Sequence, residues 1–171
     1  ACLAAVTGSG SPEQSGERVG ASLSAGSAGS VARSDLHGIR VLVTAGGTRE
    51  PLDPVRYLGN RSSGKQGVAL AETAGERGAE VTLVACNLGP LELDPGIRVV
   101  TAGSALELQA AVQHEKAHAD VVVMCAAVAD FRPKHYADTK IKKTHGGGAG
   151  ADGRPDESAP VIELVRNPDI L

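Results

Sequence analysis

This chain has few aromatic residues and a small net charge. Its 171 residues include no tryptophan, two tyrosines and one phenylalanine, and the formal net charge is -3. Proteins that bind nucleic acids without sequence preference use basic surfaces and aromatic side chains that stack on bases. The composition therefore argues against general nucleic-acid binding.

Cysteines and long hydrophobic runs are few as well. Cys2, Cys86 and Cys125 include no C-x-x-C pair, which argues against a disulfide framework and a structural zinc site and favours the reducing cytoplasm. The longest apolar run, residues 121–129, is far shorter than the roughly 20 residues that span a bilayer. No basic segment precedes the apolar start of the chain, so we expect no signal peptide, no membrane partner and a chain that is a fragment.

Composition divides the chain at residue 39. More than half of residues 1–38 are glycine, serine or alanine without apolar periodicity, so we expect a disordered linker or tail there. Residues 39–171 are expected to form one incomplete nucleotide-binding domain. Within it, residues 144–160 contain five glycines and two prolines and are predicted to be a mobile loop.

Short apolar runs alternate with helical patterns in the second part. Strands are predicted at residues 39–45, 80–86, 97–101 and 120–126, with a last strand over 160–165 that returns to the sheet. Helices are predicted at 64–77 and 104–118, the second one capped by Ser104 with Glu107 three residues later. This order indicates an α/β, Rossmann-like three-layer fold with a mostly parallel sheet, truncated at its C-terminus.

The segment after the first strand, TAGGTREPLDPVRYLGNRSSGKQG, is a candidate anion site. Glycines permit close backbone approach, and the free N–H groups at the start of a helix attract phosphate. Neither G-x-x-x-x-G-K-[ST] nor G-x-G-x-x-G is present, and a tight turn before an ordinary helix explains the residues equally well. The candidates are Gly46, Gly47, Ser62, Ser63 and Gly64.

Polar and basic residues surround this segment. Asn60 is suited to bind a substrate carbonyl or to form a local turn, and Arg49, Arg56 and Arg61 are phosphate candidates or solvated surface arginines. A second basic stretch follows Asp130, in which Ile141 is expected to pack down and to direct Lys140 inward. That stretch contains Arg132, Lys134, Lys140, Lys142 and Lys143. His114 and His118 are four apart without a third ligand, so the sequence assigns no metal site, and Cys125 is expected to be inert.

Four motifs, TAGGTREPLDPVRYLGNRSSGKQG, AAVADFRP, KIKK and NPDIL, occur in an order and spacing that resemble a known family. The chain resembles the phosphopantothenate–cysteine ligase (phosphopantothenoylcysteine synthetase) domain of bacterial bifunctional coenzyme A biosynthesis proteins, over residues 39–143 and 161–171. The resemblance implies that 4′-phosphopantothenate and L-cysteine are joined through an acyl cytidylate made from CTP, with Mg²⁺ on the phosphates. The AAVAD and KIKK forms favour CTP over ATP.

The resemblance also implies site residues and partners. Asn60 and Lys140 are the expected catalytic residues, and Arg56 and Arg61 are the phosphate candidates. A homodimer is expected, and FMN is expected only if a decarboxylase domain belongs to the parent protein. Besides the glycines and serines above and Lys140, the expected nucleotide-binding residues are Met124, Cys125, Ala126, Asp130, Asn167, Pro168 and Asp169.

Two other functions fit parts of the sequence. An inactive or non-catalytic nucleotide-binding fragment would follow from the expected truncation. A dinucleotide-binding oxidoreductase would fit the T-A-G-G opening, but the third glycine of that fingerprint and an acidic residue after the second strand are both missing, and ACNLG stands there instead.

Overall fold

The computed structural model describes residues 34–90, 92–141 and 161–170, all of which belong to one compact unit. Residues 1–33 of the predicted linker, the predicted loop 144–160, and Lys142 and Lys143 lie outside these described residues. The elements, in chain order, are β1 (Arg40–Gly46), β2 (Arg49–Asp53), β3 (Arg56–Gly59), α1 (Lys65–Glu76), β4 (Glu80–Cys86), β5 (Arg98–Ala102), α2 (Ala105–Glu115), a 3-10 turn (Lys116–His118), β6 (Val121–Met124), β7 (Phe131–Pro133) and β8 (Leu164–Arg166).

The central sheet is parallel and has the strand order β5-β4-β1-β6. Its strands are the four apolar runs that the sequence predicts, with ends that differ from the prediction by at most two residues. Val43 of β1 pairs with Leu83 of β4 on one side and with Val123 of β6 on the other. Because β1 has partners on both sides, its carboxyl end lies in the middle of the sheet edge where loops converge.

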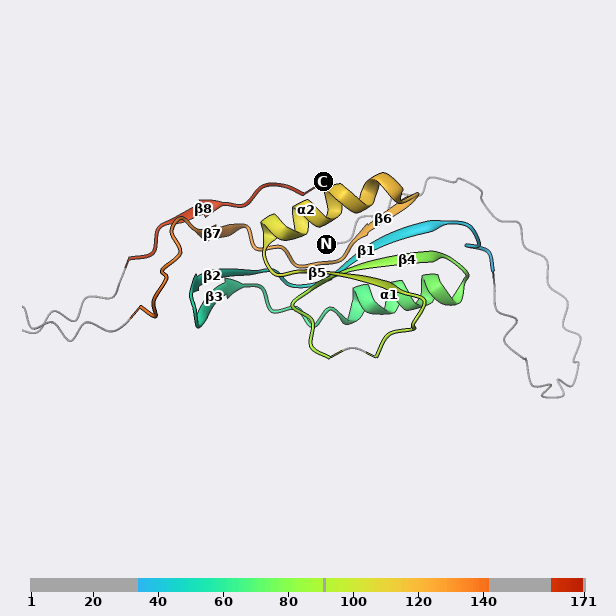
Figure 1. Ribbon diagram of the computed structural model, residues 1–171, viewed down its shortest axis with the longest axis horizontal. Coiled ribbons are helices and arrows are strands. Elements are labelled where there is room, and N and C mark those ends of the chain that lie inside the picture. Colours follow the sequence, from blue (N-terminus) through green and yellow to red (C-terminus); the bar gives the residue numbers. More distant parts are fainter. Residues whose placement is uncertain (1–33, 91, 142–160, 171) are drawn as a thin grey trace, which may run out of the picture. The chain divides into compact units, whose positions relative to one another are not determined.

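The two helices cover opposite faces of this sheet (Figure 1). Successive strand residues point to opposite faces, so Val41 and Val43 pack with Ala71 of α1, whereas Leu42 packs with Leu108 of α2. The strands are thus apolar on both faces, and the predicted three-layer α/β fold is confirmed.

Specific residues set the helix starts. Gly64 precedes α1 with φ 71°, a left-handed conformation that favours glycine. Ser104 caps α2 as predicted, and its Oγ accepts from the Glu107 N–H at 3.3 Å. The Glu107 carboxylate, however, accepts from the N–H of Gly103, at 2.6 Å, instead of from Ser104 as a standard capping box would have it.

Two antiparallel pairs of strands lie beyond the carboxyl ends of β1 and β6, and neither pairing was predicted. The first is a hairpin, whereas the strands of the second are far apart in the sequence. β2 pairs with β3, and β7 pairs with β8 (Figure 1). The prediction that the last strand returns to the main sheet is therefore wrong, because β8 pairs with β7 alone. The buried Glu50 carboxylate of β2 accepts from the N–H of Ala105 at 2.9 Å, which ties the first hairpin to the start of α2.

The folded unit begins before residue 39. Residues 35–38 form a turn in which the N–H of Leu36 donates to the carbonyl of Arg77, and Asp35 forms an ion pair with the same arginine. This turn packs against the end of α1, so residues that the sequence analysis assigned to the linker belong to the domain.

Candidate functional site

A cavity of about 570 Å³ lies at the carboxyl end of β6, a volume that suits a small-molecule ligand. One wall is the segment from β6 to β7, and the other is the NPDI segment after β8. Six of the predicted nucleotide-binding residues meet here, whereas Cys125 is not among the lining residues. The cavity is lined by Met124, Ala126, Val128, Ala129, Asp130, Phe131, Arg166, Asn167, Pro168, Asp169 and Ile170.

Two buried threonines, in β1 and in the loop after it, bind the backbone of the first wall. Thr44 Oγ1 accepts from the N–H groups of Cys125 and Ala126, each at 3.1 Å. Thr48 Oγ1 accepts from the N–H of Ala129 at 2.9 Å. Neither threonine was predicted. Thr44 carried a signal, because a hydroxyl in an otherwise apolar buried strand needs a partner. Thr48 lies in the loop after β1 and carried no such signal.

Asn60 lies beside this wall. Its Nδ2 donates to the carbonyl of Val128 at 2.8 Å, and Val128 lines the cavity. The side chain is exposed, and its Oδ1 accepts no hydrogen bond from the described residues. Asn60 is thus placed next to the cavity, and its catalytic role stays a prediction.

The second wall is anchored at several points. The Asn167 side chain and backbone bind the first wall, Gln109 Nε2 donates to the carbonyl of Asp169 at 3.3 Å, and Ile170 is buried in the core beneath α2. The carboxylates of Asp130 and Asp169 are exposed, and both residues line the cavity. Gln109 was not expected from the sequence, because its role depends on a segment far along the chain.

The glycine-serine turn does not line this cavity. A Cβ on Gly46 would lie 2.0 Å from the carbonyl oxygen of Cys86, and one on Gly64 would lie 2.1 Å from a Leu88 methyl carbon. These glycines therefore permit close packing of the protein against itself. Ser62 Oγ accepts from the N–H of Gly64 at 3.4 Å, and Ser63 is exposed. A phosphate role for Gly46, Gly47, Ser62, Ser63 and Gly64 stays a prediction.

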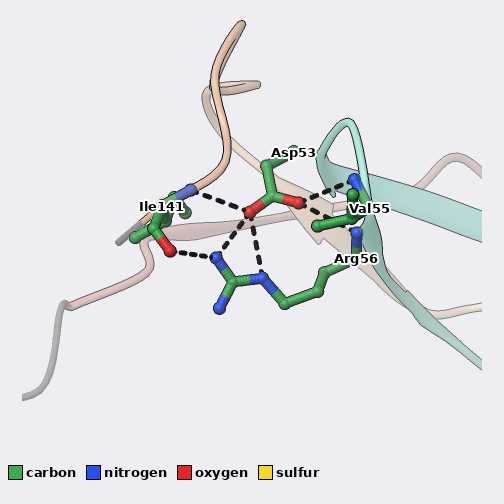
Figure 2. Close-up of polar contacts among 4 residues, drawn as sticks. All are labelled: Asp53, Val55, Arg56 and Ile141. Atoms are coloured by element: carbon green, nitrogen blue, oxygen red, sulfur yellow. Dashed lines mark hydrogen bonds and ion pairs between the residues drawn. The ribbon is translucent and has the colours of Figure 1, made fainter. Parts of the chain in front are cut away.

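Asp53, Arg56 and Ile141 form a polar network at the turn of the first hairpin (Figure 2). The Asp53 side chain accepts from the N–H groups of Val55, Arg56 and Ile141 at 2.9, 2.9 and 3.1 Å. The Arg56 guanidinium donates to Asp53 and, at 2.6 Å, to the carbonyl of Ile141. This guanidinium above all holds the pKa of Asp53 well below its usual range.

This network fixes the backbone next to Lys140. Ile141 is half-buried and fixed at both its N–H and its carbonyl, as expected for a residue that packs down. Lys140 itself is exposed and is not among the residues that line the 570 Å³ cavity, so the expectation that it points inward is wrong. The neighbouring backbone is nevertheless fixed, so the base of the lysine side chain has a defined position.

None of the predicted phosphate arginines lines the 570 Å³ cavity. The guanidinium carbon of Arg49 lies 4.7 Å from the centre of the Tyr57 ring. Arg56 donates to Asp53, and Arg61 is exposed. A second cavity of about 740 Å³, between the first hairpin, β7 and the start of α2, brings Arg49, Arg56, Arg132 and Lys134 together. Lys134 pairs there with Glu163 at 2.9 Å, so part of this charge is already neutralised.

The position after β4 differs from that of a dinucleotide-binding protein. Asn87 has φ 48°, and its Nδ2 donates to the carbonyls of Gly47 and Gly103 at 2.9 and 2.6 Å. A ribose-binding acidic residue would stand at the end of this strand, but here the side chain joins two loops of the protein itself. The local structure therefore argues against the oxidoreductase alternative.

The described residues contain no group of three or more His, Cys, Asp or Glu side chains arranged to hold a metal. The rings of His114 and His118 are 6.4 Å apart. Burial raises the pKa of Cys86 to about 11, which disfavours the reactive thiolate. Among the helices of the described part of the chain, none has the length and hydropathy to cross a membrane.

Residues 36–171 match the family of the DNA/pantothenate metabolism flavoprotein C-terminal domain. The chain is 54% identical to the coenzyme A biosynthesis bifunctional protein CoaBC of Mycolicibacterium smegmatis and 45% identical to CoaBC of Escherichia coli K12. These alignments cover 80% and 81% of this chain but only 30% and 32% of those proteins. The chain thus spans about a third of the length of these relatives.

Solved structures show the same fold. The crystal structure of the C-terminal domain of CoaBC matches with a TM-score of 0.63 and 39% identity, covering 81% of this chain and 58% of that one. A Cab2 mutant in complex with phosphopantothenate-cysteine matches with a TM-score of 0.56 and 18% identity, covering 82% and 59% of the two chains. At that identity the second likeness concerns the fold alone.

Proposed function

Because the chain belongs to the DNA/pantothenate metabolism flavoprotein C-terminal domain family, we propose that it is the ligase part of a coenzyme A biosynthesis protein. The reaction is the joining of 4′-phosphopantothenate and L-cysteine with CTP. The observation that carries the proposal is the 570 Å³ cavity at the end of β6, where the AAVAD and NPDI motifs meet although they are far apart in the sequence.

A carboxylate is a poor electrophile, so the substrate must first be activated. The carboxylate oxygen of 4′-phosphopantothenate attacks the α-phosphorus of CTP, and the bond to pyrophosphate breaks. The amine of cysteine then attacks the acyl carbon, loses a proton and displaces CMP. Activation and displacement both develop negative charge on phosphate oxygens, which positioned N–H groups and cations stabilise.

The cavity supplies groups for the nucleotide. In this proposal Met124, Ala126 and the carboxylate of Asp130 bind it from one wall, and Pro168 and Asp169 pack against it from the other. Cys125, which does not line the cavity, has no contact with the nucleotide in this proposal. Asn60 is beside the wall and is assigned to the acyl carbonyl, because an amide both donates and accepts. Lys140 is assigned to the phosphates, which requires its exposed side chain to swing toward the bound nucleotide.

Magnesium fits the same place. Carboxylate oxygens are the ligands that Mg²⁺ prefers besides phosphate, and Asp130 and Asp169 line the cavity with exposed carboxylates. When bound there, the ion would neutralise charge on the triphosphate. A homodimer and a cytoplasmic setting belong to the proposal. FMN does not, because it depends on a separate decarboxylase domain.

The test is pyrophosphate release by the chain with Mg²⁺ and 4′-phosphopantothenate, with CTP, ATP and NADH compared in binding by calorimetry. CTP-dependent release supports the ligase. Binding of CTP without release would leave a non-catalytic nucleotide-binding domain, and preference for NADH would replace the proposal with the oxidoreductase alternative.

A further inference from the structure

Asn167 joins the two walls of the cavity. Its Nδ2 donates to the carbonyl of Ala129 at 2.7 Å, and its backbone N–H donates to the carbonyl of Asp130 at 2.8 Å. Both acceptors are backbone atoms of the segment that forms the first wall. One residue of the NPDI segment therefore binds two consecutive peptide groups across the cavity mouth.

Arg132 fixes the orientation of the Asn167 amide. The NH1 group of Arg132 donates to Asn167 Oδ1 at 3.0 Å and to the carbonyl of Arg166 at 2.7 Å. An amide with a cationic donor at its oxygen must direct its NH₂ group the other way, which is toward Ala129. Both ends of the side chain are engaged by the protein before any ligand arrives.

The first wall depends on support from both sides. From β1 and the loop after it, Thr44 and Thr48 accept from the N–H groups of the wall, whereas from the NPDI side Asn167 donates to its carbonyls. Backbone hydrogen bonds hold the start of the wall, because the N–H groups of Cys125 and Ala127 donate to carbonyls at the end of β1. Residues 128–130 have no such backbone bond to β1 within the described part of the chain. The shape of this part of the wall is therefore set by the side chains and by Asn167.

We infer that Asn167, held by Arg132, is a positioning residue that sets the spacing of the two cavity walls and does not itself contact the ligand. This replaces the nucleotide-binding role that the sequence analysis assigns to it. The inference rests on the proposed function only for the identity of the ligand.

The first test needs no ligand. Asn167→Asp keeps the size of the side chain and the pairing with Arg132 but removes the donor to Ala129. Hydrogen exchange at the N–H groups of residues 125–131 is expected to be roughly tenfold faster, because one partly buried hydrogen bond is lost. Exchange in β1 and β4 is expected to stay unchanged. Gln113→Glu, the same amide-to-acid change on the exposed face of α2, is the matched control.

The second test separates positioning from contact. Dissociation constants of CTP, CDP, CMP, UTP and 2′-deoxy-CTP are measured for the native chain, Asn167→Asp and Asn167→Leu. If Asn167 is a positioning residue, its substitution raises all the dissociation constants by the same factor, roughly tenfold. If Asn167 instead contacts one group of the nucleotide, the native chain binds the nucleotide that lacks this group more weakly than the others, and the substitution removes that difference.

The outcomes are distinct. Faster exchange confined to residues 125–131 with a uniform loss of affinity supports the inference. Unchanged exchange, or loss of discrimination against a single nucleotide, overturns it. A native chain that binds none of the nucleotides overturns the proposed function, and the exchange result then still decides whether Asn167 holds the wall.

Discussion

The hydroxyl of Thr48 accepts a hydrogen bond of 2.9 Å from the N–H of Ala129, although the two residues are 81 positions apart in the chain. Thr48 is fully buried and Ala129 is nearly so. The contact fastens the loop after β1 to the loop after β6, the two strands that lie side by side in the sheet. The wall of the cavity is thus tied to the first strand of the domain.

Thr48→Val is expected to destabilise the protein by roughly 1–3 kcal/mol, because it leaves the buried N–H of Ala129 without an acceptor at nearly unchanged volume. Urea denaturation measures the difference. Thr48→Ser retains the hydroxyl and is expected to lose less. Equal losses in the two variants would mean that the methyl group, and not the hydrogen bond, carries the effect.

Gly67→Ala is expected to destabilise the protein although alanine is the better helix former. The new Cβ would lie 2.6 Å from the Cβ of Ala45 and 2.8 Å from the carbonyl oxygen of Thr44, so α1 would have to move away from β1. Overpacking of this kind costs about 1–3 kcal/mol, more than the helix propensity returns.

Gly75→Ala in the same helix is the matched control for that prediction. Its Cβ would meet nothing closer than a carbon of Ile97 at 3.9 Å, so the variant is expected to be more stable by about 0.5–1 kcal/mol. Thermal melts of both variants should shift in opposite directions. Shifts in the same direction would contradict the packing of α1 against β1.

Acid is expected to unfold the domain partly through Asp120. Hydrogen bonds from the side chain and backbone of Arg40 lower the pKa of Asp120 from 3.8 to about 2. A carboxyl whose pKa is lower in the folded state contributes stability above its unfolded pKa and loses it as the pH falls from about 4 to about 2. Asp53, whose pKa is also lowered, acts in the same direction.

Asp120→Asn should therefore show a shallower loss of stability below pH 4 than the native chain, as measured by urea midpoints at several pH values. Asp138→Asn, which changes an exposed carboxylate outside this ion pair, should retain the native slope. An Asp120→Asn chain with the native acid slope would contradict the assignment.

Lys140→Gln is expected to lower pyrophosphate release about 100-fold or more, since it removes a cation assigned to the transition state. The side chain is exposed, so the melting temperature should not change. Lys116→Gln, on the turn after α2, is the control for loss of a surface lysine. Undiminished release by Lys140→Gln would remove this lysine from the mechanism.

Asn60→Asp is expected to allow formation of the acyl cytidylate but to slow its consumption, so the intermediate should accumulate in quenched reactions analysed by mass spectrometry. The carboxylate also lacks the donor that binds the Val128 carbonyl at 2.8 Å. Wild-type kinetics without accumulation would contradict the role given to Asn60.

The sheet and its helices were predictable because their signals are local. The runs around Val43, Leu83 and Val123 are largely apolar, and Ser104 marks the start of α2 by itself. Hairpin β2–β3 was missed because it is largely exposed, includes Pro51 and shows no clear alternation of apolar and polar residues.

The site was predictable only in part. Ala126, Asp130 and Pro168 were found through their motifs, and the structure brings them to one cavity. The functions of Thr44, Thr48 and Asn87 within the structure were not predicted, because each binds a segment far away in the sequence. Arg56 was predicted to bind phosphate, but its guanidinium donates hydrogen bonds to Asp53.

The burial of Ile170 in the same core cluster as Leu42 has a consequence for synthesis on the ribosome. The second wall of the cavity cannot dock until residue 170 has left the exit tunnel, long after β1, α1 and β4 are available to pair. The scaffold can thus assemble during translation, whereas the cavity closes late. The part of this apolar cluster that Ile170 covers should stay exposed through that interval, even after α2 has packed on the sheet.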